Sequence, residues 1–153
     1  MAKQEKESLE ELTQGQVAIS RRKLGGEAPI VVNEIIEGCL YTGMFGTLDS
    51  ARMKAVVDLI LAVASNSDTD IIIIDLSNID IVDSAIATQL IKINKTLQMV
   101  GMQVMFCGIK PIVAQSIVAA GIDIGNVDVV KNLKAAVMEV FKRKGLKVVK
   151  ADQ

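Results

Sequence analysis

The run Ile71-Ile72-Ile73-Ile74-Asp75 indicates the fold class of this chain. Four consecutive isoleucines are too few for a helix, and their β-branched side chains favour a strand. No polar residue alternates with them, so both faces of this strand are expected to be buried. Strands of that kind lie at the centre of parallel sheets that carry helices on both faces. The run therefore predicts an α/β fold.

Strand and helix patterns alternate on both sides of this run. Before it, residues 30–37 and 39–45 have strand patterns joined at Gly38, which favours a hairpin. A helix is predicted next from apolar residues at helical spacing, namely Met53, Val56, Val57, Ile60, Leu61 and Ala64. After the run we expect, in order, a helix through Ile86, Leu90, Ile93 and Leu97, a strand at 103–107, a helix between Pro111 and Gly121, a strand at 128–130 and a helix that stops at Gly145. The order β-β-α-β-α-β-α-β-α predicts a mixed, mostly parallel central sheet with flanking helices.

The domain is expected to span residues 29–145, because a chain of 153 residues has room for one core. Residues 1–28 are polar and are predicted to be a tail or linker. Residues 146–153 are predicted to be a basic C-terminal tail. Residues 27–130 have a net charge of −7, whereas residues 131–153 have a net charge of +5. We interpret the bases at 142–144 as partners of the negative end of the last helix, not as a site for nucleic acid or lipid.

The composition excludes several kinds of chemistry. The chain has no His, so it offers no imidazole base or ligand, and its two cysteines cannot build a four-thiolate zinc site. It has no Trp and one Tyr, which argues against stacking on single-stranded nucleic acid. Cys39 and Cys107 lie in apolar strand patterns and are expected to be buried, inert thiols. The charged N-terminus and the lack of a long apolar run predict a cytoplasmic protein without membrane contact.

No enzyme motif is present in the sequence. It contains neither a glycine-rich phosphate loop nor a G-x-S-x-G elbow, so we expect a protein without catalytic groups or cofactors. One cluster of acidic residues is a candidate metal site. Asp75, Asp80 and Asp83 lie at or just after the carboxyl end of the isoleucine strand. Three carboxylates there suit Mg²⁺. The alternative function is therefore a small Mg²⁺-dependent, receiver-like phosphoacceptor or a phosphatase, although the acidic pair that a receiver has after its first strand is missing.

The segment from Ile74 to Ser84, IDLSNIDIVDS, resembles the defining motif of STAS domains, the family of anti-sigma-factor antagonists. In that pattern an apolar strand is followed by D-L-S/T, a short apolar turn, and D-S/T at the start of a helix. The segment GIKP at 108–111 and the residues that follow it resemble the stressosome branch of the family. The segment GTLDSAR at 46–52 is similar to the loop before the first helix of stressosome scaffold subunits. The resemblance covers residues 28–143 and fits both the scaffold and the antagonist subunit type.

The resemblance implies a phosphorylation-regulated binding module of a bacterial stress response. Its partners would be a serine/threonine kinase of the anti-sigma type and homologous STAS subunits. It implies Ser84 as the primary phosphorylation site, Ser50 as a secondary site, and Asp80, Asp83 and Ser84 as partner-binding residues. The residues themselves leave another interpretation open, in which the hydroxyl groups of Ser84 and Ser50 cap the helices that begin there.

Overall fold

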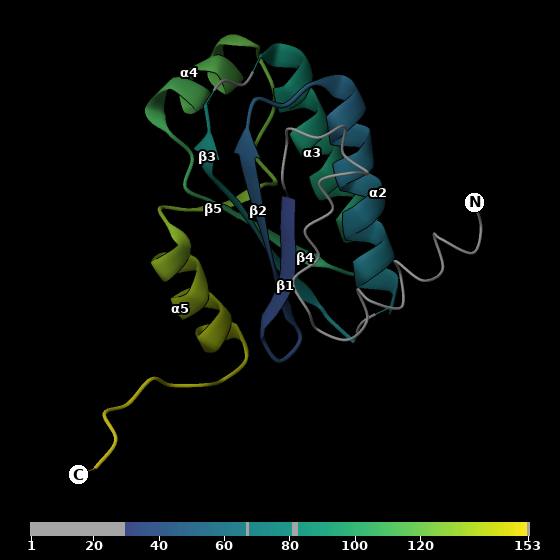
Figure 1. Ribbon diagram of the computed structural model, residues 1–153. Coiled ribbons are helices and arrows are strands. Elements are labelled where there is room, and N and C mark those ends of the chain that lie inside the picture. Colours follow the sequence, from purple (N-terminus) through teal and green to yellow (C-terminus); the bar gives the residue numbers. More distant parts are fainter. Residues whose placement is uncertain (1–29, 67, 81–82, 153) are drawn as a thin grey trace.

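The computed structural model describes residues 30–66, 68–80 and 83–152 (Figure 1). The elements follow one another in the predicted order. Their bounds are β1 (Ile30–Ile36), β2 (Cys39–Gly46), α2 (Ser50–Asn66), β3 (Ile71–Ile79), α3 (Ser84–Met99), β4 (Gln103–Cys107), α4 (Pro111–Ala119), β5 (Asp128–Val130) and α5 (Leu133–Arg143). The predicted α/β fold is therefore confirmed, whereas the predicted tail at 1–28 lies outside the described residues.

The five strands form one sheet in the order β1-β2-β3-β4-β5. The β1–β2 pair is an antiparallel hairpin, and the other three pairs are parallel. The isoleucine run lies in the central strand, and its four side chains are at most 1 % exposed. The prediction of a strand buried on both faces is confirmed.

The sheet separates two apolar layers. Helices α2 and α3 lie together on one side of the sheet (Figure 1). Ile72 and Ile74 pack in the larger layer, together with side chains of these two helices. Ile71 and Ile73 point to the opposite face, where Ala136 and Val140 of α5 cover them. This opposite layer is small, because α5 is the helix that packs on β3, β4 and β5 there. The rest of that face carries the polar side chains described below.

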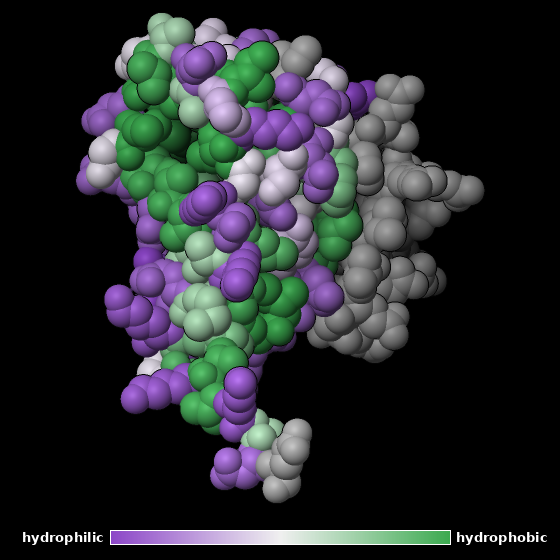
Figure 2. Space-filling view, turned by 90° about the vertical axis from the view of Figure 1, so that its left-hand side faces the viewer, coloured by the Kyte–Doolittle hydropathy of each residue, from purple (hydrophilic) through white to green (hydrophobic). Residues whose placement is uncertain are grey.

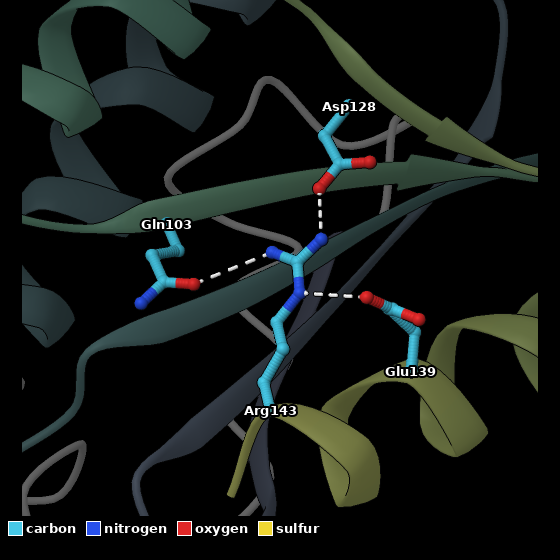
Figure 3. A network of polar contacts seen from close by, with 4 residues as sticks. All are labelled: Gln103, Asp128, Glu139 and Arg143. Carbon is cyan, nitrogen blue, oxygen red and sulfur yellow. Dashed lines mark hydrogen bonds and ion pairs between the residues drawn. The ribbon is translucent and has the colours of Figure 1, made fainter.

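Arg143 fastens the end of α5 to the sheet (Figure 3). Its guanidinium donates to Glu139 Oε1 at 3.1 Å, to Gln103 Oε1 at 3.3 Å and to the carboxylate of Asp128 in β5. Lys144 forms an ion pair with Asp70 over 3.3 Å. Arg143 and Lys144 therefore have specific partners in addition to the helix dipole that the sequence suggested.

The central strand is longer than the sequence indicated. The motif predicted a turn after Ser77, but β3 continues to Ile79. The extension is possible because β2 shifts its register between Gly43 and Phe45 and then pairs Phe45 with Asn78 and Gly46 with Ile79.

Within the described ranges, no helix is long and apolar enough to span a bilayer.

Candidate functional site

The predicted site residues gather at one edge of the sheet, where the parallel strands β2 and β3 end. We call this region the Ser84 edge and define it by Ser50, Asp80, Ser84 and Lys110. The backbone N–H of Asp80 donates to Gly46 O at 3.4 Å, which joins the ends of the two strands. Helices α2 and α3 both begin at this edge (Figure 1). The carboxyl edge of a parallel sheet is where α/β folds generally place their binding sites.

Ser84 is the first residue of α3 and its side chain is exposed. The helix is capped by Asp83, whose carboxylate accepts a hydrogen bond from Ile86 N at 2.8 Å. The interpretation that the Ser84 hydroxyl caps this helix is therefore wrong, because the preceding residue has the extended backbone that a cap requires. The hydroxyl of Ser84 therefore does not cap the helix, and it lies at the positive end of the helix dipole.

Ser50 has the same local setting at the start of α2. The carboxylate of Asp49 accepts from Arg52 N at 2.9 Å, and its carbonyl accepts from Met53 N at 2.9 Å. Asp49 is thus the cap of α2, and the interpretation of Ser50 as the cap is also wrong. Ser50 is exposed. The two candidate serines are therefore structural equivalents on neighbouring helices.

Asp80 and Lys110 connect the end of β3 to the start of α4. The Nζ of Lys110 lies 3.7 Å from Asp80 Oδ1, and the two side chains are 39 % and 69 % exposed. A contact of this length at this exposure adds little stability. Its importance is that it places a cation beside Asp80 on the Ser84 edge, within reach of a binding partner.

Asp75 forms a buried polar group with Tyr41 and Ser77, within β3 and before the strand reaches the Ser84 edge. Its side chain is 6 % exposed. Oδ2 accepts from the Tyr41 hydroxyl at 2.8 Å, and Oδ1 accepts from Ser77 N at 3.0 Å and from the Ser77 hydroxyl. The carboxylate thus has three donors in place of water, as a buried charge requires.

Two glycines make room for this group. Gly43 lies opposite Asp75 in the β2–β3 pair, so the phenol of Tyr41 can reach across to the carboxylate. Gly108 has φ +71°, and a Cβ there would lie 2.0 Å from Ser77 Oγ. The sequence singled out Gly108 in a motif but missed Tyr41, because their proximity to Asp75 depends on the register of three strands. Gly43, two residues after Tyr41 in the same strand pattern, is the one sequence signal that could have indicated the contact between Tyr41 and Asp75.

The Mg²⁺ hypothesis is wrong for this geometry. Asp75 is buried among its own donors, Asp80 pairs with Lys110, and Asp83 caps α3. Within the described part of the chain, no group of three or more His, Cys, Asp or Glu side chains could hold a metal ion. The three carboxylates are close in sequence, but they turn to different partners.

Cys39 and Cys107 are completely buried on the α5 face of the sheet, as predicted. Burial raises the pKa of both thiols, to about 11 for Cys39 and to about 12 for Cys107, where the negative charge of Asp75 and a hydrogen bond to it contribute to the rise. Neutral, buried thiols are poor nucleophiles.

The raised thiol pKa values predict a loss of stability at alkaline pH. Both values in the folded chain lie above the ordinary 9.0, so the thiols stay neutral in the fold and ionise first in the unfolded chain. Their contribution to stability is complete below that value and decreases as the pH rises through it. The free energy of unfolding should therefore fall from about pH 9 to about pH 12, the interval between the ordinary value and the values in the folded chain. Denaturant titrations across this range test it, and a Cys39→Ala/Cys107→Ala variant should show a shallower fall; an identical slope in both proteins would contradict the assignment.

The fold and its edge can now be compared with known proteins. The model of the STAS domain family matches residues 31–140, which is most of the described domain. This chain belongs to the STAS domain family. The match includes all five strands except the first residue of β1, and it includes the whole Ser84 edge.

Three known proteins illustrate what this STAS domain is similar to. The RsbT co-antagonist protein RsbRA of Bacillus subtilis is 25 % identical over 122 residues, which cover 80 % of this chain and 44 % of RsbRA. An RsbS structure from Moorella thermoacetica superposes with a TM-score of 0.65 at 21 % identity, covering 78 % of this chain and 99 % of that one. The anti-sigma factor antagonist SpoIIAA in its unphosphorylated form superposes with a TM-score of 0.62 at 15 % identity, covering 78 % and 99 %. The matched region covers less than half the length of the curated RsbR relatives RsbRA and RsbRD.

Proposed function

We propose that this STAS domain is a phosphorylation-regulated protein-binding module in a partner-switching pathway of the stress response. In its unmodified form it binds a serine kinase of the anti-sigma type through the Ser84 edge. Phosphorylation of Ser84 then releases that kinase. The observation that carries the proposal is the position of Ser84. This exposed residue is the first of α3, and the helix is capped by Asp83 and not by the Ser84 hydroxyl.

The names of the relatives support this role. RsbRA is a co-antagonist of RsbT, and SpoIIAA is an anti-sigma factor antagonist with an unphosphorylated form. Both names describe antagonists. A binding module needs no catalytic group. The sequence contains neither a glycine-rich phosphate loop nor a G-x-S-x-G elbow, and a binding module does not require them.

The geometry supports a switch that leaves the fold unchanged. A phosphate on Ser84 adds about −1.5 to −2 charges at pH 7. The free N–H groups at the start of α3 favour an anion, so the helix should persist. Asp80 and Asp83 are close by in sequence, so negative charge accumulates on a surface that carries Lys110 as a cation. A partner must then desolvate a dianion to stay bound, which weakens binding without a conformational change.

Calorimetric titration of the kinase tests the proposal directly. The kinase is first identified by pull-down from the source cell with mass spectrometry of partners and phosphosites. Ser84→Ala should bind it like the unmodified chain and resist release. Ser84→Asp should bind about tenfold more weakly, and the phosphorylated chain on the order of 100-fold more weakly.

Ser50 provides the matched control, because it also begins a helix after a capping aspartate. Ser50→Asp adds the same charge in the same local setting, and it should weaken kinase binding less than Ser84→Asp does. Equal affinity of all Ser84 forms for the kinase would remove Ser84 from the switch. A larger effect at Ser50 would move the primary site there.

A further inference from the structure

The C-terminal segment (residues 146–150, Leu-Lys-Val-Val-Lys) is unusually apolar for an exposed end of a domain. Helix α5 is closed at Gly145, which has φ +70°, and Leu146 N donates back to Phe141 O at 2.8 Å. Beyond this point the chain leaves the domain (Figure 1). Leu146, Val148 and Val149 are 50 %, 64 % and 78 % exposed. The sequence predicted a basic tail here, but its exposed apolar side chains are the more unusual feature.

The apolar side chains of this segment are only partly buried by the rest of the described chain. It borders an open groove of about 760 Å³, whose other wall includes Met138 and Phe141 of α5. Hydrophobic and hydrophilic residues adjoin one another on this face and along the segment that projects from it (Figure 2). Among the described residues, no backbone hydrogen bond involves 147–152. Paired valines between lysines have high strand propensity, so the segment has the composition of a strand without a sheet.

Strand β1 offers a sheet edge that fits this composition. It is one of the two edge strands of the sheet, and within the described residues it pairs with β2 alone. Glu34 and Glu37 are exposed on β1 and its turn, and Ile35 is 40 % exposed. A strand edge with acidic and apolar side chains complements a segment with lysines and valines.

The exit of the segment lies beside this same hairpin. One cleft is lined by Glu37 and Gly38 from the hairpin and by Lys144 and Leu146 from the end of α5. A second copy related by a two-fold axis at this end of the domain would therefore bring each C-terminal segment to the hairpin of the other copy. Such a contact is self-complementary and closes as a dimer.

We propose that the C-terminal segment of one copy pairs with β1 of a second copy, reciprocally, and so forms a strand-exchanged dimer. Lys147 and Lys150 of the segment then lie near Glu34 and Glu37 of the hairpin of the other copy. Five extended residues span about 17 Å, which is within the length of a seven-residue strand. Main-chain hydrogen bonds supply affinity and the charges supply register, as in other cases of strand addition.

Sedimentation equilibrium of the full chain tests this proposal. We expect a concentration-dependent dimer that a chain lacking residues 146–153 does not form. Val148→Pro removes a backbone donor without changing charge and should raise the dimer Kd by about tenfold or more. A strictly monomeric full chain, or a dimer that survives the truncation, would overturn the proposal.

Charge reversal separates this dimer from simple apolar contact between two α5 helices. Lys147→Glu/Lys150→Glu should raise the dimer Kd, whereas Lys131→Glu/Lys134→Glu, which changes the same charge at the other end of α5, should not. Adding Glu37→Lys to the first variant should restore dimerisation; Glu34 is left intact because its carboxylate accepts from Gly38 N at 2.7 Å. Added salt should weaken the proposed dimer. Salt that strengthens it, or equal Kd values for both double variants, would favour apolar packing of α5 and reject strand exchange.

Discussion

Replacing Gly108 by alanine should lower the free energy of unfolding by about 3 kcal/mol or more. Two independent causes act at this position. The backbone has φ +71°, a conformation that costs L-residues about 1–2 kcal/mol. The added Cβ would also lie 2.0 Å from Ser77 Oγ, 2.8 Å from Asp75 Oδ1 and 3.0 Å from Ser77 N. Relief requires Ser77 to leave its hydrogen bonds to Asp75, so the damage reaches the buried polar group.

Gly121→Ala is the matched control for this substitution. Gly121 has φ +66°, but a Cβ there would meet nothing within 4 Å. It should therefore show the backbone cost alone, and urea unfolding of both variants isolates the contribution of the crowded site. Ser77→Ala combined with Gly108→Ala should recover part of the loss, because the nearest atom is removed. Equal losses for Gly108→Ala and Gly121→Ala would show that crowding against Ser77 is unimportant.

The elements that the sequence predicted well are those defined by local patterns. The isoleucine run needs no distant partner to favour a strand, and the apolar spacing of α3 by itself indicates which face is buried. The end of β3 was missed because Asn78 and Ile79 join the strand only through pairing with Phe45 and Gly46. That pairing depends on a register shift in β2, which leaves no local signature.

The candidate site shows the same division. The sequence placed Ser50 and Ser84 at the starts of helices and Asp80 just after the central strand, and the structure brings them to one edge. It could not decide which residue caps each helix, because Asp and Ser are both good caps and adjacent residues compete for the role. The backbone decides: Asp83 has ψ 175° and Ser84 is already helical. The same decision leaves the serine hydroxyl available for modification.

Removing the carboxylate of Asp75 should also be strongly destabilising. Asp75→Ala is expected to lower the free energy of unfolding by about 3 kcal/mol, because hydrogen bonds to a charged group contribute more than neutral ones and their buried donors would lose their acceptor. The donors left behind are the Tyr41 hydroxyl, Ser77 N and the Ser77 hydroxyl. Asp75→Asn keeps the shape and one carbonyl acceptor, so its loss should be about 1 kcal/mol.

A double-mutant cycle with Tyr41→Phe tests whether the loss arises from this hydrogen-bonded group. Once Asp75 is gone, the Tyr41 hydroxyl is an orphaned donor, and its removal should do less harm than in the parent chain. The two substitutions should therefore couple by about 1 kcal/mol. Additive losses would assign the effect of Asp75→Ala to a cavity, not to hydrogen bonding.

Titration of the Tyr41 phenol supplies a readout that a cavity would not change. Burial raises the pKa of Tyr41 above its ordinary value, and the hydrogen bond to Asp75 and the charge of its carboxylate raise it further. In Asp75→Asn the charge disappears while burial remains, so the pKa should fall yet stay above the ordinary value. Ultraviolet titration of this tyrosine, the one in the chain, measures the change without interference from another phenol. An unchanged pKa in Asp75→Asn would mean that the carboxylate does not govern this tyrosine, and the polar group beneath the Ser84 edge would then be held together by burial alone.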